Sequence, residues 1–308
     1  SADLPLQFWQ DVDVTFSMSG ETDGGLAFGV SVDLDEAGNL GNQFANQGVA
    51  VFISGDFGTL TLGDTDGAVD RVITDMGNIG NPGSINDAET GHVGYLGSWL
   101  DGSGDGQIVR YDYTFDAFSF ALSVEQMPSG ANGTVLEDDE DLTWAVGFGY
   151  DFEFNGGSVD LGVGYQYSDN GLITISIGQT AATALGIADD PATGADEDQG
   201  EIQLGGGEVG MWAIGAAVNL DAGFSGGITY SNFDFDGGDT VTHIGVGLGY
   251  SFDAFSIHAN YGYWAAENDV DASGWGISAG YDLGGGASLL LGYGQGEFSP
   301  DLDGDGSG

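Results

Sequence analysis

Apolar and polar residues alternate along most of this chain with a period of two. In 143–152 every second residue is apolar, and the residues between are small or polar. The same alternation runs through 11–18, 26–34 and 242–252, and helical spacing fits none of these stretches. Because successive side chains of a strand point to opposite faces, this period predicts β-strands with one apolar face.

Short turns and long polar loops separate the expected strands in alternation. Glycine and Asn in the turns supply the positive φ that tight hairpins require. The turns lie at 21–24, 56–58, 115–118, 154–157, 221–223, 252–255 and 283–286. The longer loops lie near 35–46, 66–106, 128–141, 169–207, 234–239 and 267–273. Seven hairpins predict about fourteen strands, each about ten residues long, which is the length that a tilted strand needs to cross a bilayer.

The character of the two strand faces separates a membrane barrel from a soluble sandwich. A sandwich would expose its polar face to solvent, whereas the non-apolar face here is mostly Gly, Ser, Ala and Asp, which suits a water-filled lumen. Aromatic residues near the turns suggest an interfacial girdle: they are Phe115, Phe118, Tyr150, Phe152, Phe154, Phe224, Tyr250, Phe252, Phe255 and Tyr281. We therefore expect an all-β transmembrane antiparallel barrel.

Composition narrows the range of functions further. The chain carries 49 acidic and 2 basic residues, a formal charge of −47, which argues against a nucleic-acid partner because phosphates require Lys and Arg. A hydrophobic content of 41% and an aromatic content of 12% argue against disorder. No run approaches the roughly 18 apolar residues of a membrane helix. The absence of Cys fits an oxidising compartment.

Three segments carry a resemblance to a known family. The sequences FSMSGETDGGLAFG at 16–29, VFISGDFGTLTLGD at 51–64 and YDLGGGAS at 281–288 are similar to outer-membrane porins of the Rhodobacter and Roseobacter type. The resemblance implies one 16-stranded barrel domain over 1–308, assembled as a homotrimer among lipid and lipopolysaccharide in the outer membrane of a Gram-negative bacterium.

The same resemblance implies passive diffusion of ions and small hydrophilic solutes. The third extracellular loop of such porins folds into the lumen as a constriction, and 66–106 is the matching segment here. Relatives begin with one more strand and end with a closing strand. We therefore expect that the first and last strands are missing and that the chain is a fragment.

Charged residues of the expected constriction are the first candidate site. By alternation Arg110 and Asp112 face the lumen, and Arg71 is the other basic residue of the chain. Two interpretations stay open: the arginines face loop carboxylates and set a transverse field, or they pair with nearby Asp and pin the loop. The loop carboxylates are Asp66, Asp70, Asp75, Asp87, Glu89, Asp101 and Asp105, and the lumen-wall carboxylates are Asp11, Asp13, Asp33 and Asp112.

These carboxylates predict a preference for cations, because rings of Asp and Glu select them. The resembled porins usually place basic residues on the wall opposite an acidic loop. In this chain acidic residues take the wall positions, so the usual pattern of charge does not carry over.

Clustered carboxylates near the end of the chain suggest a second kind of site. Asp301, Asp303 and Asp305 have the spacing of a calcium loop, followed by Gly306, but the usual Glu at the twelfth position is absent. Other clusters lie at 138–141, 189–198 and 234–239. No cofactor is expected to be required, and Ca²⁺ is a candidate ligand. An alternative function is therefore a calcium-dependent adhesin or phage-receptor barrel.

The histidines give little support for catalysis. The chain has three: His92, His243 and His258. Alternation places His243 and His258 on the lumen face of one hairpin, where a barrel hydrolase or a His-containing metal site would need them. No nucleophile motif accompanies them, and we expect that the protein is not an enzyme.

Overall fold

The computed structural model is built almost wholly of antiparallel strands. It describes residues 14–36, 44–85, 92–94, 107–126, 142–169, 172–176, 201–205, 208–236, 240–266 and 270–299. Side chains at 33–36, 44–47, 172–176, 201–205, 270 and 298–299 lie outside this description. Within these ranges no helix is long and apolar enough to cross a bilayer.

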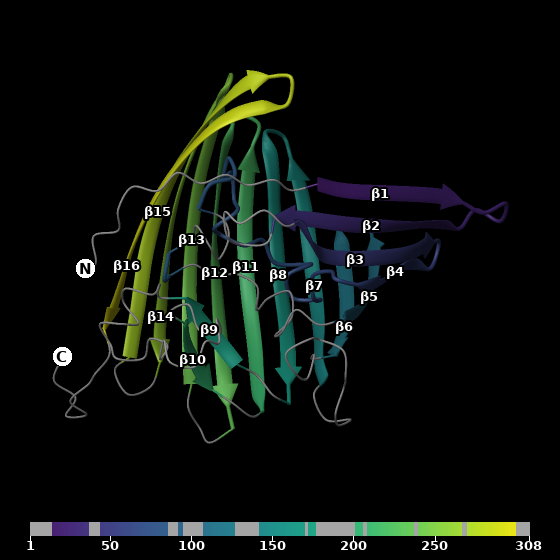
Figure 1. Ribbon diagram of the computed structural model, residues 1–308, viewed down its shortest axis with the longest axis horizontal. Coiled ribbons are helices and arrows are strands. Elements are labelled where there is room, and N and C mark those ends of the chain that lie inside the picture. The colour runs from purple at the N-terminus through teal and green to yellow at the C-terminus, as the bar shows by residue number, and fades with distance from the viewer. Residues whose placement is uncertain are drawn as a thin grey trace.

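Fourteen strands form one sheet in which neighbours along the chain are neighbours in space, except that β8 pairs with β11. The strands of this sheet are β1 (Val14–Glu21), β2 (Ala27–Glu36), β3 (Phe44–Gly55), β4 (Gly58–Gly63), β5 (Gln107–Phe115), β6 (Phe118–Gln126), β7 (Leu142–Phe154), β8 (Gly157–Ser168), β11 (Val209–Leu220), β12 (Phe224–Phe235), β13 (Thr240–Phe252), β14 (Phe255–Ala266), β15 (Val270–Gly284) and β16 (Ala287–Ser299). The prediction of about fourteen strands is confirmed. Figure 1 shows β1 and β16 at the two ends of this curved sheet.

One feature of the long loops escaped the prediction. Within 169–207, β9 (Leu172–Ser176) pairs with β10 (Glu201–Gly205) to form a separate two-stranded ladder. Its segments, LITIS and EIQLG, are short and adjoin long polar stretches, so their alternation was too brief to stand out.

The apolar face of the strands points outward, as the alternation predicted. In β7, Trp144 and Phe148 are exposed on the outer side, whereas Ala145 and Gly147 between them are buried. Aromatic residues join across strands near the short turns, in the pairs Phe118–Tyr150, Phe224–Tyr250, Phe252–Phe255 and Phe255–Tyr281. A second set contains Trp144–Tyr165, Trp212–Tyr230 and Trp275–Tyr293. Aromatics in such girdles are typical of barrels that sit between two membrane interfaces.

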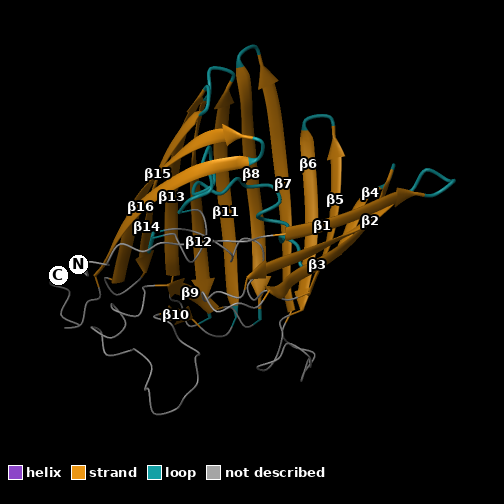
Figure 2. Cartoon of the chain, turned by 45° about the horizontal axis from the view of Figure 1, so that its top comes forward, coloured by secondary structure: helices purple, strands orange, loops and turns teal. Residues whose placement is uncertain are grey.

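The concave side of the sheet holds the chain that follows β4. Figure 2 shows this segment, in teal, inside the curve of the strands. We name residues 64–94 the inner loop; its described parts are 64–85 and 92–94. Its apolar side chains Ala68, Val69 and Ile73 are buried against Ala121, Ala145 and Ala213 of the wall, among others. The main packed core is therefore a seam between one loop and the inner wall.

Candidate functional site

The inner loop follows the wall through most of the sheet. The amide of Ala68 donates a hydrogen bond to Ser123 Oγ of β6 at 2.9 Å. Further along, Ser278 of β15 donates to Asn81 Oδ1 at 2.9 Å. Asn81 also accepts from the amide of Gly83 and donates to the carbonyl of Gly77, which fixes the local turn. These contacts hold one loop to strands that are distant from it in sequence.

Glycines on the inner face of the strands make this close approach achievable. A β-carbon built on any of these glycines would fall within 3 Å of the inner loop, too close for ordinary contact. The glycines are Gly147, Gly162, Gly164, Gly215, Gly227, Gly247, Gly249, Gly262, Gly274, Gly276, Gly280, Gly292 and Gly296. They form what we name the glycine seat. The inner glycines were expected to line water; in these strands they receive the loop instead, because a missing side chain leaves room for another backbone.

A single helical turn begins the inner loop and divides its side chains between two environments. The amide of Ile73 donates to the carbonyl of Val69 at 3.0 Å, and that of Arg71 to the carbonyl of Gly67 at 3.1 Å. Residues four apart share a face of such a turn. Val69 and Ile73 are thus buried in the seam, while Asp66 and Arg71 are exposed on the other side.

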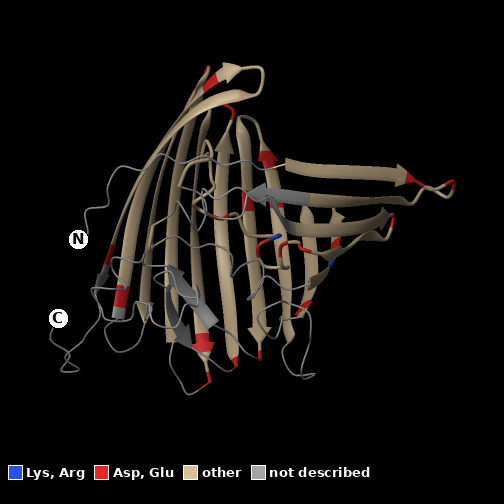
Figure 3. Cartoon of the chain, in the orientation of Figure 1, with Lys and Arg blue, Asp and Glu red and all other residues tan. Residues whose placement is uncertain are grey.

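Both basic residues of the chain meet the same carboxylate. Arg110 Nε lies 3.0 Å from Asp112 Oδ2, and Arg71 Nε lies 3.5 Å from Asp112 Oδ1. Arg110 also donates from Nη1 to the carbonyl oxygen of Asp66 at 2.6 Å, and the same atom is 3.6 Å from the Asp66 carboxylate. Arg110 is buried and therefore ties the start of the loop to β5, whereas the Arg71 side chain is half exposed. Figure 3 shows the basic residues, in blue, among acidic ones near β3–β5.

The Asp70 carboxyl in this cluster is an unusually weak acid, with a raised pKa. Burial, together with the neighbouring carboxylates of Asp66 and Asp75, raises the pKa of Asp70 to about 7, while Arg110 opposes the rise. Both protonation states of Asp70 are therefore populated near neutral pH. The charge of the cluster thus changes in the range where a channel would work.

A pocket of about 450 Å³ opens beside the two arginines. Phe52 of β3, Thr59 and Thr61 of β4 and Thr114 of β5 line it together with Arg71, Arg110 and Asp112. Water-accessible space on the concave side therefore occurs next to β3–β5, on the part of the wall that precedes the glycine seat. Phe52 was not among the sequence candidates, because an aromatic residue in a strand gives no sign that it faces inward.

The structure describes some of the remaining candidate site residues, and the others lie outside the described ranges. Asp75 lies farther along the loop, where it lines a small pocket with His92 and His243. The backbone of Asp33 pairs with Thr15 in β1, but its side chain lies outside the description. The candidates outside the described residues are Asp11, Asp13, Asp87, Glu89, Asp101, Asp105, Asp301, Asp303 and Asp305. Within the part of the chain that is described, no three acidic or His residues gather as metal ligands.

Two of the three histidines, His243 of β13 and His258 of β14, face the inner loop and bind its backbone. His243 Nε2 lies 2.9 Å from the Gly94 carbonyl oxygen, and His258 Nδ1 lies 2.8 Å from that of Ile79. Alternation placed both residues on the inner face correctly. The structure adds that loop carbonyls occupy one nitrogen of each ring.

Comparison with known proteins agrees with this architecture. The family model described as Gram-negative porin matches residues 1–301. The chain belongs to the Gram-negative porin family. It is 29% identical to a porin of Rhodobacter capsulatus over 288 residues, covering 91% of this chain and 84% of the relative.

Solved porin structures share the fold of this family member. A porin structure refined at 1.8 Å resolution matches with a TM-score of 0.63 at 21% identity, covering 94% of this chain and 88% of the other. A triple mutant of Rhodopseudomonas blastica porin matches with a TM-score of 0.56 at 16% identity, covering 92% and 84%. The porin therefore has the transmembrane β-barrel fold of these neighbours, and the sequence resemblance is confirmed.

Family membership settles the coarse function and location. The protein is a porin of the bacterial outer membrane and forms a channel through it. Membership in this family also indicates a channel rather than an enzyme.

Proposed function

We propose that this porin prefers cations and lets ions and small hydrophilic solutes diffuse passively. The observation that carries the proposal is the charge balance at the start of the inner loop. Asp66, Asp70 and Asp112 surround Arg71 and Arg110. Within the described part of the chain, the two guanidinium groups form their ion pairs with Asp66 and Asp112. The arginines are thus neutralised by carboxylates, and the surrounding excess of acidic groups sets the sign of the local potential.

The charge of the rest of the protein also favours a negative electrostatic potential. The whole chain carries a formal charge of −47, and charges within about 8–10 Å of the solute path are only partly screened at physiological salt. The proposal combines both sequence interpretations of the arginines: Arg110 would pin the loop, while the half-exposed Arg71, which lines the 450 Å³ pocket together with Arg110, would face diffusing solutes. A solute would therefore meet one half-exposed cation in an acidic setting.

The test is the reversal potential of purified protein in a planar bilayer under a KCl gradient. A potential of the sign expected for K⁺ permeation supports the proposal. The preference should also grow as pH rises through about 7, because Asp70 then becomes charged. A potential of the sign expected for Cl⁻ permeation would overturn the cation preference without affecting the identification as a porin.

We further propose a homotrimer embedded in lipid and lipopolysaccharide, on the basis of the sequence resemblance. Chemical cross-linking of the detergent-solubilised protein tests it, and a product limited to the monomer would contradict it. The calcium-dependent alternative stays a prediction, because most of its acidic clusters fall outside the described residues. Calcium-dependent binding to cells or phage, with a conducting pore absent, would favour that alternative.

A further inference from the structure

An aromatic ring lies open to the lumen beside the start of the inner loop. Phe52 is on the inner face of β3, is half-buried, and lines the 450 Å³ pocket. Phe233, Phe235 and Trp264 also face inward, but they are buried in the main core. A solute in the pore can therefore touch the ring of Phe52.

The ring of Phe52 is held in place by the neighbouring strand. Gly29 of β2 is the register partner of Phe52, and a β-carbon built on Gly29 would lie 2.5 Å from Phe52 Cε1. The ring therefore leans over the backbone of β2, into the space that the glycine leaves free. Because the ring is fixed before a ligand arrives, binding to it costs little entropy of ordering.

Polar groups of β4 and β5 continue from this ring across the wall. Phe52 pairs in register with Thr61, and Thr61 pairs with Arg110. Thr59 shares a hydrogen bond with Ser54 at 2.8 Å. A hydroxyl group has one hydrogen and two lone pairs, so Thr59 can still bond to a ligand.

Two polar side chains of the pocket are exposed. Thr114 of β5 and Arg71 of the inner loop both line the pocket. Arg71 meets Asp112 through Nε, and its Nη atoms carry further N–H donors. The pocket therefore presents hydrogen-bond donors and acceptors around an apolar ring.

The charged groups at this pocket are already paired, which decides the kind of ligand. Asp112 Oδ2 lies 3.0 Å from Arg110 Nε, and Asp112 Oδ1 lies 3.5 Å from Arg71 Nε. An ionic ligand would have to break one of these pairs, whereas a neutral molecule can bond to the pairs as they stand. The volume of about 450 Å³ lies within the range of small-molecule sites, ~300–1,000 Å³.

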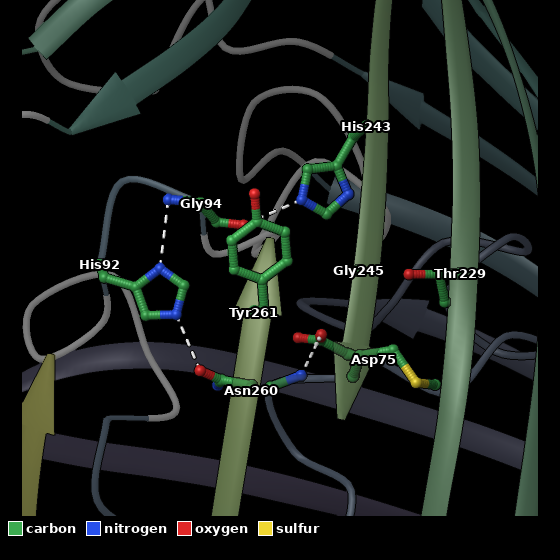
Figure 4. Close-up of a pocket in the computed structure, with 10 residues that line it drawn as sticks. Asp75, His92, Gly94, Thr229, His243, Gly245, Asn260 and Tyr261 are labelled. Atoms are coloured by element: carbon green, nitrogen blue, oxygen red, sulfur yellow. Dashed lines mark hydrogen bonds between the residues drawn. The ribbon is translucent and has the colours of Figure 1, made fainter. Parts of the chain in front are cut away.

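A second pocket shows how little space remains where the inner loop is docked on the wall. Its volume is about 10 Å³, and His92 and His243 lie there on either side of Gly94 (Figure 4). Such a volume holds about one water molecule. Of these two pockets, the one beside β3–β5 is therefore the one that can hold a solute.

We propose that the pocket lined by Phe52, Arg71 and Thr114 is a binding subsite for neutral sugars that pass through the channel. The C–H face of a pyranose ring lies on Phe52, and the sugar hydroxyls bond to Thr59, Thr114 and Arg71. The pocket opens on the concave side of the sheet, so its ligands are sugars that enter the lumen. The proposal deepens the passive diffusion of small hydrophilic solutes and rests on it, but it does not rest on the cation preference.

Single-channel recording in planar bilayers, with maltose as the probe, tests this proposal. In symmetric KCl, maltose should reduce the ion current of the wild type in a saturable way, after correction for the bulk conductivity of the solution. A polyethylene glycol of the same hydrodynamic radius is the control solute. It also excludes ions from the pore, but it lacks the sugar's hydroxyls and rigid C–H face, so its effect should grow with concentration without saturating.

Variants of the pocket separate stacking from hydrogen bonding. Phe52→Leu keeps an apolar side chain without the ring and should weaken maltose binding by about three- to tenfold, whereas Phe52→Tyr keeps the ring and should bind as the wild type does. Thr114→Val keeps the shape without the hydroxyl and should weaken binding by about threefold. Phe148→Leu removes an aromatic ring from the outer face of β7 and is the matched control, with binding unchanged.

The ion current measured before maltose is added keeps the two proposals apart. A protein that conducts no ions contradicts both the proposed function and the subsite. An open channel that maltose blocks no more saturably than the polymer does contradicts the subsite alone. A saturable block of equal affinity in the wild type and in Phe52→Leu also contradicts the subsite, because the ring then has no part in binding.

Discussion

The glycine seat can be tested by adding one methyl group to it. In Gly162→Ala, the new β-carbon would lie 2.8 Å from the carbonyl carbon of Val72 and 2.8 Å from Ile73 Cγ1, and it would also overlap the Val72 carbonyl oxygen. Ordinary contact begins at 3.4 Å. The loop backbone must therefore move away from the wall by more than half an ångström. Because the obstacle includes rigid backbone, we expect the free energy of unfolding to fall by about 1–3 kcal/mol.

The matched control is Gly226→Ala on the outer face of β12. There the nearest atom to a new β-carbon is the tip of the flexible Leu248 side chain, 2.8 Å away, which can turn aside. Replacing Gly by Ala in a strand otherwise restricts the unfolded chain and is stabilising by about 0.4–1 kcal/mol. Urea unfolding in lipid vesicles, followed by tryptophan fluorescence, measures both variants. If Gly162→Ala is as stable as Gly226→Ala, the inner glycines do not seat the loop.

Three further predictions concern the start of the inner loop. In Arg110→Met, Asp112 keeps only the half-exposed Arg71, and we expect stability to fall by about 2 kcal/mol, less than for a fully buried pair, in the same urea assay; an unchanged midpoint would contradict the pinning role. Replacing Ser123 by Ala leaves the amide of Ala68 without its acceptor and should cost about 1–3 kcal/mol, whereas a loss near zero would mean that water replaces the hydroxyl. In Asp70→Asn, the growth of cation preference between pH 6 and pH 8, expected because the pKa of Asp70 is about 7, should vanish from reversal potentials; a wild-type pH profile would assign that titration elsewhere.

The sequence alone determined the strands and the faces of the wall. A period of two is a local property, so it can be read without knowing what a strand packs against. It placed Trp144 and Phe148 outside, and His243, His258 and Arg110 inside, in agreement with the structure. The sequence also predicted the aromatic girdle, because aromatic residues near the strand ends favour the membrane interfaces regardless of their tertiary contacts.

Only the tertiary structure decided what the inner face touches. Glycine has no side chain to signal a contact. The sequence therefore predicted that Gly162 and Gly247 line water, whereas in the structure they contact the inner loop. Arg71 meets Asp112, 41 positions away in the sequence, and His243 meets Gly94, 149 positions away. Such contacts depend on the path of a loop across strands, and that path is set by packing rather than by any local pattern.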